Sequence, residues 1–496
     1  MSQSDRRNRL AVLDQQIPQL RLLLERLEEE RIQVIESLTF PILTLPVDVT
    51  TEIFLRCLPP PPKTPRVSDA PLLLVRICRQ WRDIAISTPE LWASLAFTVS
   101  EPNTELLAAR DHLIERWLAR SGQYPLSIRV LESPRPLRSD NAVTGAKSVD
   151  SCLRLLLEHS AQWRHVEIEV DLPGMKRALE AVKSHTPFDF PQLEYWRIGV
   201  DNYESEDSGQ FRVGAAPQLR SIHLTLGVAP LDFRGTGIPW SQLTNLTGHS
   251  FDPAECVLIL RLCPALVRGR FALCSDIAPP SQPILLHPSL EFLDLSHLNG
   301  RWRNLNIGFQ VLDAITLPGL ISLTLDCVGN GQSIVSLLTR SSCRLHGLAL
   351  SCDFYDYQAL FGCFLVVPEL RRLRIFAAGS STWTGIFTRL TGNSEMLPNL
   401  QSLSIQDKRI RYNFPVDKLL LFLKSRTDHP ALRHFKFTGT HEASKSTLDL
   451  SRFAEPILQG IQKEIPGIQR FPEGDFSEEP NEDEGDDDEP IYPNVK

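Results

Sequence analysis

Apolar residues recur at a helical spacing near the start of the chain. Between residues 10 and 38 they fall three or four positions apart, and the stretch ERLEEER places charges between them. This spacing is typical of an amphipathic helix. Pro18 removes a backbone donor, so the regular helix is predicted to run from about Gln19 to Ser37. We expect residues 1–39 to form a helix that packs on the next domain, with coiled-coil dimerisation as the alternative.

Two shorter helical patterns follow within residues 40–95. In LPVDVTTEIFLRCL, Pro46 suits a first helical turn and Asp48 favours the positive end of the helix. The prolines at 59–62 end this helix, and APLLLVRICRQWRDIAIS predicts a second one before TPELWASLAFTV turns into a strand. Two helices of this composition carry more apolar surface than so small a segment can cover. We therefore expect the segment to bind a partner protein.

The same residues resemble the F-box motif. Its pattern of Leu-Pro, an acidic residue, Ile-Phe and a later Val-x-x-Cys-Arg-x-Trp is matched in order by Leu45, Pro46, Asp48, Ile53, Phe54, Leu58, Val75, Cys78, Arg79 and Trp81. The surrounding sequence is similar to F-box-like proteins of mushroom-forming fungi. The resemblance implies a small all-α domain that binds a Skp-type linker protein and, through it, the cullin of an SCF-type ubiquitin ligase.

The resemblance also implies which side chains contact the linker. These are Leu45, Pro46, Ile53, Phe54, Leu58, Leu72, Val75, Cys78 and Trp81. We expect a few large central side chains among them to dominate the binding energy. For Phe54 and Trp81 the alternative is that they only hold the small domain together.

A phrase of the form L-x-x-L-x-L recurs through the second half of the chain. The first leucine of each copy stands at 193, 219, 243, 266, 290, 320, 345, 370, 400 and 432. These steps of 23 to 32 residues resemble the period of leucine-rich repeats. The last two apolar positions alternate as in a short strand, and helical patterns such as SIVSLLTR fill the intervals.

The fold class expected from these patterns is α/β. An N-terminal helix and a small all-α F-box precede an irregular leucine-rich-repeat-like solenoid at 191–470, in which short parallel strands alternate with helices. Residues 96–190 are expected to form irregular α/β repeats leading into the solenoid, with a helix at 104–120 and a strand at 164–170. Residues 471–496 are expected to be an acidic, disordered tail.

Alternate positions of the predicted strands should line the concave face of the solenoid. They include Tyr195, Arg197, His223, Arg268, Arg270, Phe292, Asp294, Arg372, Arg374, His434 and Lys436. Arginine is frequent among them, which favours a target with an acidic or phosphorylated element. The candidate target-binding residues are Tyr195, Arg197, Arg268, Arg270, Arg372, Arg374 and Lys436. A solvated face is the alternative, and the acidic tail could also cover it.

Charge and cysteine content narrow the choice of partner and compartment. Eleven of the 60 acidic residues lie in 473–489, so residues 1–472 hold 49 acids against 51 bases. A nearly neutral body does not favour nucleic-acid binding. The ten cysteines are scattered without a C-x-x-C pair, which indicates reduced thiols rather than a metal site. The chain has neither a signal-peptide pattern nor a run of eighteen apolar residues, so we expect it in the cytoplasm or nucleus, away from membranes.

Catalytic chemistry has little support in the sequence. The stretch VGNGQSI at 328–334 lies between a strand and a helix, as a phosphate-binding turn would, but it lacks the rest of a nucleotide fingerprint. We find no catalytic motif and expect no cofactor, no metal and no enzyme activity. The predicted function is substrate recognition within a ubiquitin ligase. The alternatives are a non-degradative scaffold that uses the same surfaces and, in a different class, a hydrolase or transferase built on the solenoid.

Overall fold

The computed structural model divides the chain into two compact units, Met1–Leu155 and Leu156–Lys496. Each unit is described by itself. The structure describes residues 3–38, 41–60, 64–99, 104–132, 151–171, 189–201, 214–226, 233–274, 283–297, 309–326, 331–352, 357–377, 380–393, 396–407, 415–426, 432, 434–439 and 469–470.

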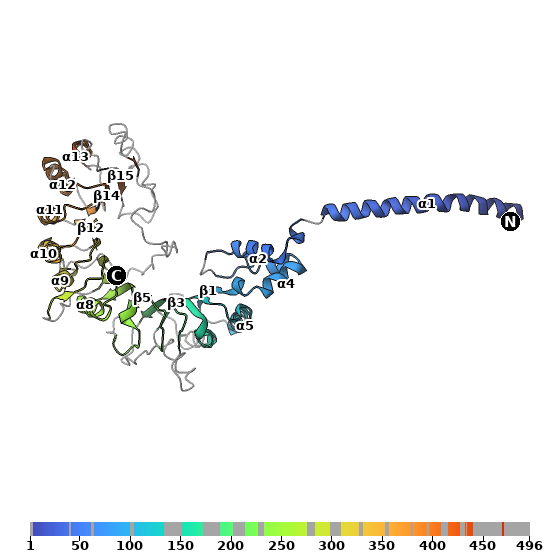
Figure 1. The fold of residues 1–496 in the computed structure, drawn as a ribbon, viewed down its shortest axis with the longest axis horizontal. Helices are drawn as coiled ribbons and strands as arrows, with labels where there is room; N and C mark the ends of the chain where they lie inside the picture. Colours follow the sequence, from blue (N-terminus) through green and yellow to red (C-terminus); the bar gives the residue numbers. More distant parts are fainter. Residues whose placement is uncertain are drawn as a thin grey trace. The chain divides into compact units, whose positions relative to one another are not determined.

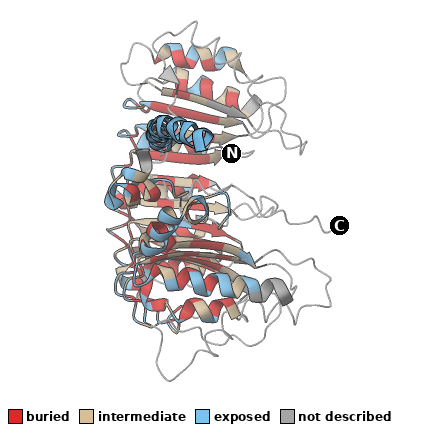
Figure 2. Cartoon of the chain, turned by 90° about the vertical axis from the view of Figure 1, so that its right-hand side faces the viewer, coloured by how far each residue is buried: buried red, intermediate tan, exposed pale blue. Residues whose placement is uncertain are grey.

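The first unit begins with one long helix, α1 (Gln3–Leu38), which runs through Pro18 without a break (Figure 1). The prediction that the regular helix begins only at about Gln19 is therefore wrong. Proline removes only one helical hydrogen bond, and an exposed carbonyl can take a water molecule instead. Every side chain described between residues 3 and 35 is exposed, as Figure 2 shows along the helix. The prediction that this helix packs on the following domain is also wrong.

Three short helices follow, preceded by the 3-10 turn η1 (Pro41–Thr44): α2 (Val47–Arg56), α3 (Leu74–Ile77) and α4 (Arg79–Ser87). Pro46 caps α2, and its carbonyl accepts hydrogen bonds from the backbone N–H of Thr50 at 3.0 Å and from its hydroxyl at 3.2 Å. The Sγ atom of Cys78 caps α4 by accepting a 3.4 Å hydrogen bond from the N–H of Trp81. Of these contacts, the Cys78 side chain satisfies an N–H group that would otherwise lack a partner at the start of α4.

The rest of the first unit is a small α/β layer. The 3-10 turn η2 (Pro89–Trp92) leads into β1 (Ser94–Val99), then α5 (Thr104–Ser121) and β2 (Leu126–Glu132), which pairs with β1 in parallel. Trp92 is fully buried, donates from Nε1 to the carbonyl of Ala85 at 2.8 Å and packs edge-on against Trp117 at 4.9 Å. The helix predicted at 104–120 is thus confirmed as α5.

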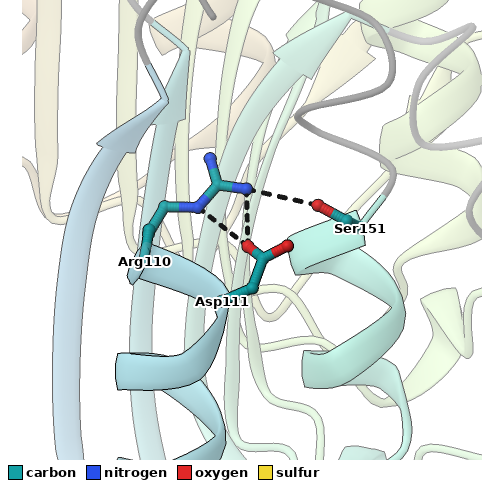
Figure 3. A network of polar contacts seen from close by, with 3 residues as sticks. All are labelled: Arg110, Asp111 and Ser151. Atoms are coloured by element: carbon teal, nitrogen blue, oxygen red, sulfur yellow. Dashed lines mark hydrogen bonds and ion pairs between the residues drawn. The ribbon is translucent and has the colours of Figure 1, made fainter. Parts of the chain in front are cut away.

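A polar contact ties α5 to the helical residues 151–157 of the chain. Arg110 donates from Nε and Nη2 to Oδ1 of Asp111 at 3.1 and 2.8 Å, and from Nη2 to the hydroxyl of Ser151 at 3.3 Å (Figure 3). Both charged side chains are largely buried, which strengthens this contact relative to one in water.

The second unit is built on a parallel sheet whose strands follow the order of the chain. Each strand pairs with those before and after it, with only β8 and β10 set apart in a separate small sheet. The strands are β3 (Trp163–Asp171), β4 (Tyr195–Asp201), β5 (Ser221–Leu226), β6 (Asn245–Phe251), β7 (Arg268–Leu273), β8 (Leu285–Leu286), β9 (Phe292–His297), β10 (Ile315–Thr316), β11 (Ser322–Asp326), β12 (Gly347–Cys352), β13 (Arg372–Ala377), β14 (Ser402–Asp407), β15 (His434–Gly439) and β16 (Gln469–Arg470).

Helices occupy several of the intervals between these strands. They are η4 (Trp240–Gln242), α8 (Pro253–Leu262), α9 (Phe309–Asp313), α10 (Gly331–Ser341), α11 (Tyr357–Val366), α12 (Ser380–Gly392) and α13 (Val416–Ser425), and the 3-10 turn η3 (Ser160–Gln162) directly precedes β3. The predicted α/β class, with parallel strands alternating with helices after an N-terminal helix, is confirmed at this level.

The register of the sheet explains the repeated leucines. Leu293, Leu323, Leu348, Leu373 and Leu403 lie side by side on neighbouring strands. The leucines that open the phrases are also buried from Leu193 to Leu400. Because side chains alternate across a strand, this register places one apolar row of each strand in the core and leaves the intervening residues on the other face.

Among the helices of the described residues, no helix is both long enough and apolar enough to cross a bilayer.

Candidate functional site

The short helices of the first unit expose apolar side chains. Four aliphatic side chains in or next to α2 and α3 are 41% to 56% exposed: Val47, Val49, Leu73 and Ile77. Beside them, Leu45, Ile53, Leu58, Leu72, Val75, Cys78 and Trp81 are partly exposed, and Pro46 is exposed. We call these residues together the helical surface. It offers an apolar contact area that the described residues do not cover.

One of the predicted linker contacts lies elsewhere. Phe54 is 0% exposed and packs edge-on against Trp81 with ring centroids 4.9 Å apart. A side chain with no accessible surface cannot contact a partner, so Phe54 joins α2 to α4 as a core residue. This is a correction to the predicted set of contacts, in favour of the alternative given for Phe54.

Trp81 is partly buried. Its ring packs on Phe54, and the rest of the residue remains accessible to solvent. Its Nε1 is buried and has no hydrogen-bond partner within the described residues. Four residues of the helical surface were not among the predicted contacts: Val47, Val49, Leu73 and Ile77. Their apolar character was visible in the sequence, but only the structure shows which side of each helix faces inward.

Hydrogen bonds hold the helical surface in shape. Gln80 donates from Nε2 to the carbonyl of Leu43 at 3.2 Å, which links α4 to η1. Arg82 donates from Nε to the carbonyl of Val75 at 2.8 Å, which links α4 to α3. A surface that is already ordered loses less conformational entropy when it binds.

The second candidate is a row of charged and imidazole side chains across the sheet. It comprises Glu169 (β3), Arg197 (β4), His223 (β5), His249 (β6), Arg270 (β7) and Asp294 (β9), and we call it the charged row. The strand register places Arg197 beside His223 and Arg270 beside Asp294. Each of the six directly follows a buried residue on its strand, so each points to the opposite face of the sheet.

Ion pairs and ring stacking organise the charged row. Glu169 forms an ion pair with Nε of Arg197 at one end, and Asp294 lies 3.3 Å from Nε of Arg270 at the other. The rings of His223 and His249 stack between the two arginines, with centroids 4.9 Å apart and planes 17° apart. Nε2 of His223 is buried and has no hydrogen-bond partner in the described chain.

The surroundings keep both histidines neutral. Burial, followed by the positive charges of Arg197 and Arg270, lowers the pKa of His223 to about 3. The same causes lower the pKa of His249, and Glu169 opposes them. At neutral pH the row therefore presents two arginines, each ion-paired with a carboxylate, separated by uncharged rings that can each offer one N–H group. An anionic group of a partner would compete with Glu169 and Asp294 for the two arginines.

The remaining predicted target-binding residues form a second group. Arg374 lies over the ring of Phe376 at 5.2 Å, and burial lowers its pKa. Arg372 shares its strand, and Lys436 lies two strands further on. Gly347 and Ala349 of β12 occupy the aligned positions beside Arg372 and Arg374. At about 4.8 Å per strand, roughly 19 Å separates these arginines from Arg268 and Arg270.

Near the charged row, Arg268 lies over the ring of Phe292 at 4.5 Å, and the Tyr195 ring is 6.3 Å from that of His165. Tyr195 and Arg197 lie on β4 and Arg268 and Arg270 on β7, with β5 and β6 between them. Arg372, Arg374 and Lys436 lie further along the sheet, on β13 and β15. His249 and Glu169 were not predicted. They stand at the third outward position of their strands, whereas the predicted residues stand at the first or second outward position.

Other chemistry finds little support in the described residues. There, no group of three or more His, Cys, Asp or Glu side chains has a metal-binding arrangement. Burial raises the pKa of Cys263 and of Cys363 to about 12, so these thiols are poor nucleophiles. Gly331 begins α10, while residues 328–330 of the glycine-containing stretch lie outside the described residues, as does the acidic tail.

Comparison of the chain with protein-family models gives no match, and comparison with curated proteins gives none either. The functional argument therefore rests on the motif and on the geometry of the two candidate sites.

Proposed function

We propose that this chain is a substrate-recognition adaptor of an SCF-type ubiquitin ligase. Residues 40–95 act as an F-box whose helical surface binds a Skp-type linker and, through it, a cullin. The second unit acts as a leucine-rich-repeat-like solenoid that binds the target protein. The observation that carries the proposal is the exposure of Val47, Val49, Leu73 and Ile77 on short helices that also hold the Leu-Pro and Cys-Arg-x-Trp motifs.

The energetics of the helical surface suit a protein partner. Covering an exposed aliphatic side chain contributes about 1.5–3 kcal/mol at most, so four of them, with the partly exposed Leu45, Ile53 and Leu72, can outweigh the loss of translational freedom on binding. Charged residues are few among the contacts, as in the core of other protein interfaces. The described residues offer no catalytic group there, and an adaptor needs none.

The second unit supports the other half of the proposal. The strands of the main sheet follow chain order, and those from β4 to β14 are preceded by buried leucines, which supports a stacked arrangement of the kind on which repeat proteins build extended binding faces. We place the target on the face that carries the charged row, with Arg197 and Arg270 binding its acidic or phosphorylated element. Holding a target beside the charged enzyme of the ligase makes lysine attack nearly intramolecular.

The test is binding of a recombinant Skp-type linker to variants of the helical surface. Val47→Asp and Ile77→Asp place a carboxylate at positions that are more than half exposed, so they leave the fold intact while burying an unpaired charge in the complex. Ile53→Asp should act in the same way. We expect the dissociation constant to rise about a hundredfold or more.

Leu365→Asp is the matched control, because Leu365 is also an aliphatic residue more than half exposed, on α11 of the second unit. It should bind the linker like the wild type. Undiminished binding by folded Val47→Asp and Ile77→Asp would remove the basis of the proposal. Co-purification separates the adaptor from a non-degradative scaffold, because only the adaptor brings down a cullin together with the linker.

A further inference from the structure

Helix α1 carries an apolar surface that the described part of the chain leaves exposed. Its large apolar side chains between Leu10 and Ile35 are 38% to 67% exposed. An isolated helix in water is only marginally stable, even with favourable residues. A second helix lying against these side chains would stabilise α1 and remove the apolar surface from water.

Six of these exposed residues form a regular seam. Leu10, Leu13, Ile17, Leu20, Leu24 and Leu27 alternate in steps of three and four, which are the a and d positions of a heptad. Leu10, Ile17 and Leu24 are a positions, and Leu13, Leu20 and Leu27 are d positions. Pro18 lies at a b position, away from the seam, so its ring does not interrupt helix pairing. The next a position is Arg31, which ends the purely apolar part.

Charges beside the seam distinguish the possible arrangements of two copies. Arg9 and Glu30 are at g positions, Asp14 and Arg21 are at e positions, and all four are exposed. When the helices run antiparallel about an axis between Pro18 and Gln19, Leu10 faces Leu27, Leu13 faces Leu24, and Ile17 faces Leu20 of the second copy.

In that antiparallel register Arg9 lies beside Glu30 and Asp14 beside Arg21 of the second copy, and symmetry gives each pair twice. A parallel pair keeps only the attraction between Arg9 and Asp14, and it places Arg31 opposite Arg31 at an a position. Charges at e and g positions select partner and orientation in coiled coils. The antiparallel register is therefore the better match for this sequence.

We propose that α1 binds α1 of a second copy of this chain as an antiparallel two-helix coiled coil. The seam of six apolar residues forms its core, and Arg9, Asp14, Arg21 and Glu30 set its direction. This inference is independent of the ligase proposal, since it uses only the exposure and sequence of α1.

The first experiment compares Leu24→Asp with Leu22→Asp in the full chain by sedimentation or light scattering over a concentration series. Both leucines are more than half exposed in α1, but Leu24 is on the seam and Leu22 is at an f position opposite it. The wild type and Leu22→Asp should be dimers, and Leu24→Asp a monomer. A monomeric wild type, a dimeric Leu24→Asp or dissociation by Leu22→Asp would each overturn the proposal.

The second experiment tests direction by exchanging charges. Arg9→Glu and Glu30→Arg should each weaken the dimer about fivefold or more at low salt. The dissociation constant of the double variant should return to within about twofold of the wild-type value, because the two charges of the pair are only exchanged. In a parallel dimer the double variant would stay weak, since Glu at position 9 would face Asp14. Failure of the double variant to recover would overturn the antiparallel arrangement.

Discussion

The sheet of the second unit and helix α1 of the first use the same residue type in different ways. Both are rich in leucine at regular spacing, yet the leucines that open the strand phrases are buried and those of α1 are exposed. Each inner strand of the sheet has a neighbour from its own chain on both sides. The side chains of helix α1 from residue 3 to residue 35 are exposed instead. Periodicity predicts an apolar face, but it does not tell which chain covers that face.

The short helices α2 to α4 are intermediate between these two cases. Phe54, Leu74 and Ile84 are buried among the helices, while Val47, Leu73 and Ile77 are exposed. The same few turns therefore build a small core and leave apolar side chains exposed. If this comparison is right, substitutions in the sheet should change stability, and substitutions on the exposed faces should change association.

The largest effect is expected from a charge in the sheet core. Leu373 is fully buried between Leu348 and Leu403. In Leu373→Asp an unpaired carboxylate would have to leave water, at a cost of several kcal/mol, about 4 or more. We expect loss of the cooperative thermal transition of the second unit, measured by circular dichroism and limited proteolysis. The exposed control, Leu365→Asp, should melt like the wild type, and equal melting of the two variants would refute the contrast.

A smaller loss is expected from Arg340, whose side chain connects α10 to the preceding segment. Its Nη2 donates to the carbonyls of Leu312 and Ile315 at 2.8 and 2.7 Å, and its Nε to the Thr316 hydroxyl at 3.1 Å. Arg340→Met should lower the free energy of unfolding by about 2–3 kcal/mol, because several hydrogen bonds to a charged group are lost together. The denaturation midpoint measures the loss. Arg344→Met, at an exposed position, should leave the midpoint unchanged.

Acid should destabilise the charged row. The pKa of His223 is lowered from 6.5 to about 3 in the folded chain, so below pH 6.5 the unfolded chain takes up a proton that the folded chain does not. Stability is therefore retained above pH 6.5 and lost as the pH falls towards 3. Between pH 7 and pH 5 the loss should reach about 1–2 kcal/mol. Melting temperatures across this range measure it.

His223→Gln is the comparison for the pH experiment, because glutamine does not titrate. Its melting temperature should fall less on acidification than that of the wild type. Burial raises the pKa of Glu255 to about 7, which acts in the opposite direction, but it does so in both proteins and cancels in the difference. Identical slopes for the two proteins would show that His223 is not the titrating group.

Much of the second unit was predictable from its sequence. The phrases that open at Leu290, Leu320 and Leu370 do place strands in parallel register, because alternate side chains on a strand must face the same side. The strand predicted at 164–170 is also present as β3. These features depend on short-range periodicity, which a single sequence displays directly.

The candidate sites were only partly predictable. Arg197 and Arg270 were identified from strand alternation, but the stacking of His223 on His249 depends on strand pairing across separate repeats. Phe54 was placed on the surface because a motif gives residue types and spacing without the direction of each side chain. The exposure of α1 was not predictable either, because apolar periodicity is equally compatible with packing on the same chain.

The smallest effect is expected on the exposed polar side of α2. Glu52 accepts a 2.9 Å hydrogen bond from Nε of Arg56, and both side chains are largely exposed. Glu52→Gln should change the free energy of unfolding by less than about 0.5 kcal/mol, because water screens such a pair. Chemical denaturation of the wild type and the variant measures the change. A loss above about 1 kcal/mol would mean that this side of α2 is tied into the fold, and the division between a folded core and a surface free for a partner would then fail for α2.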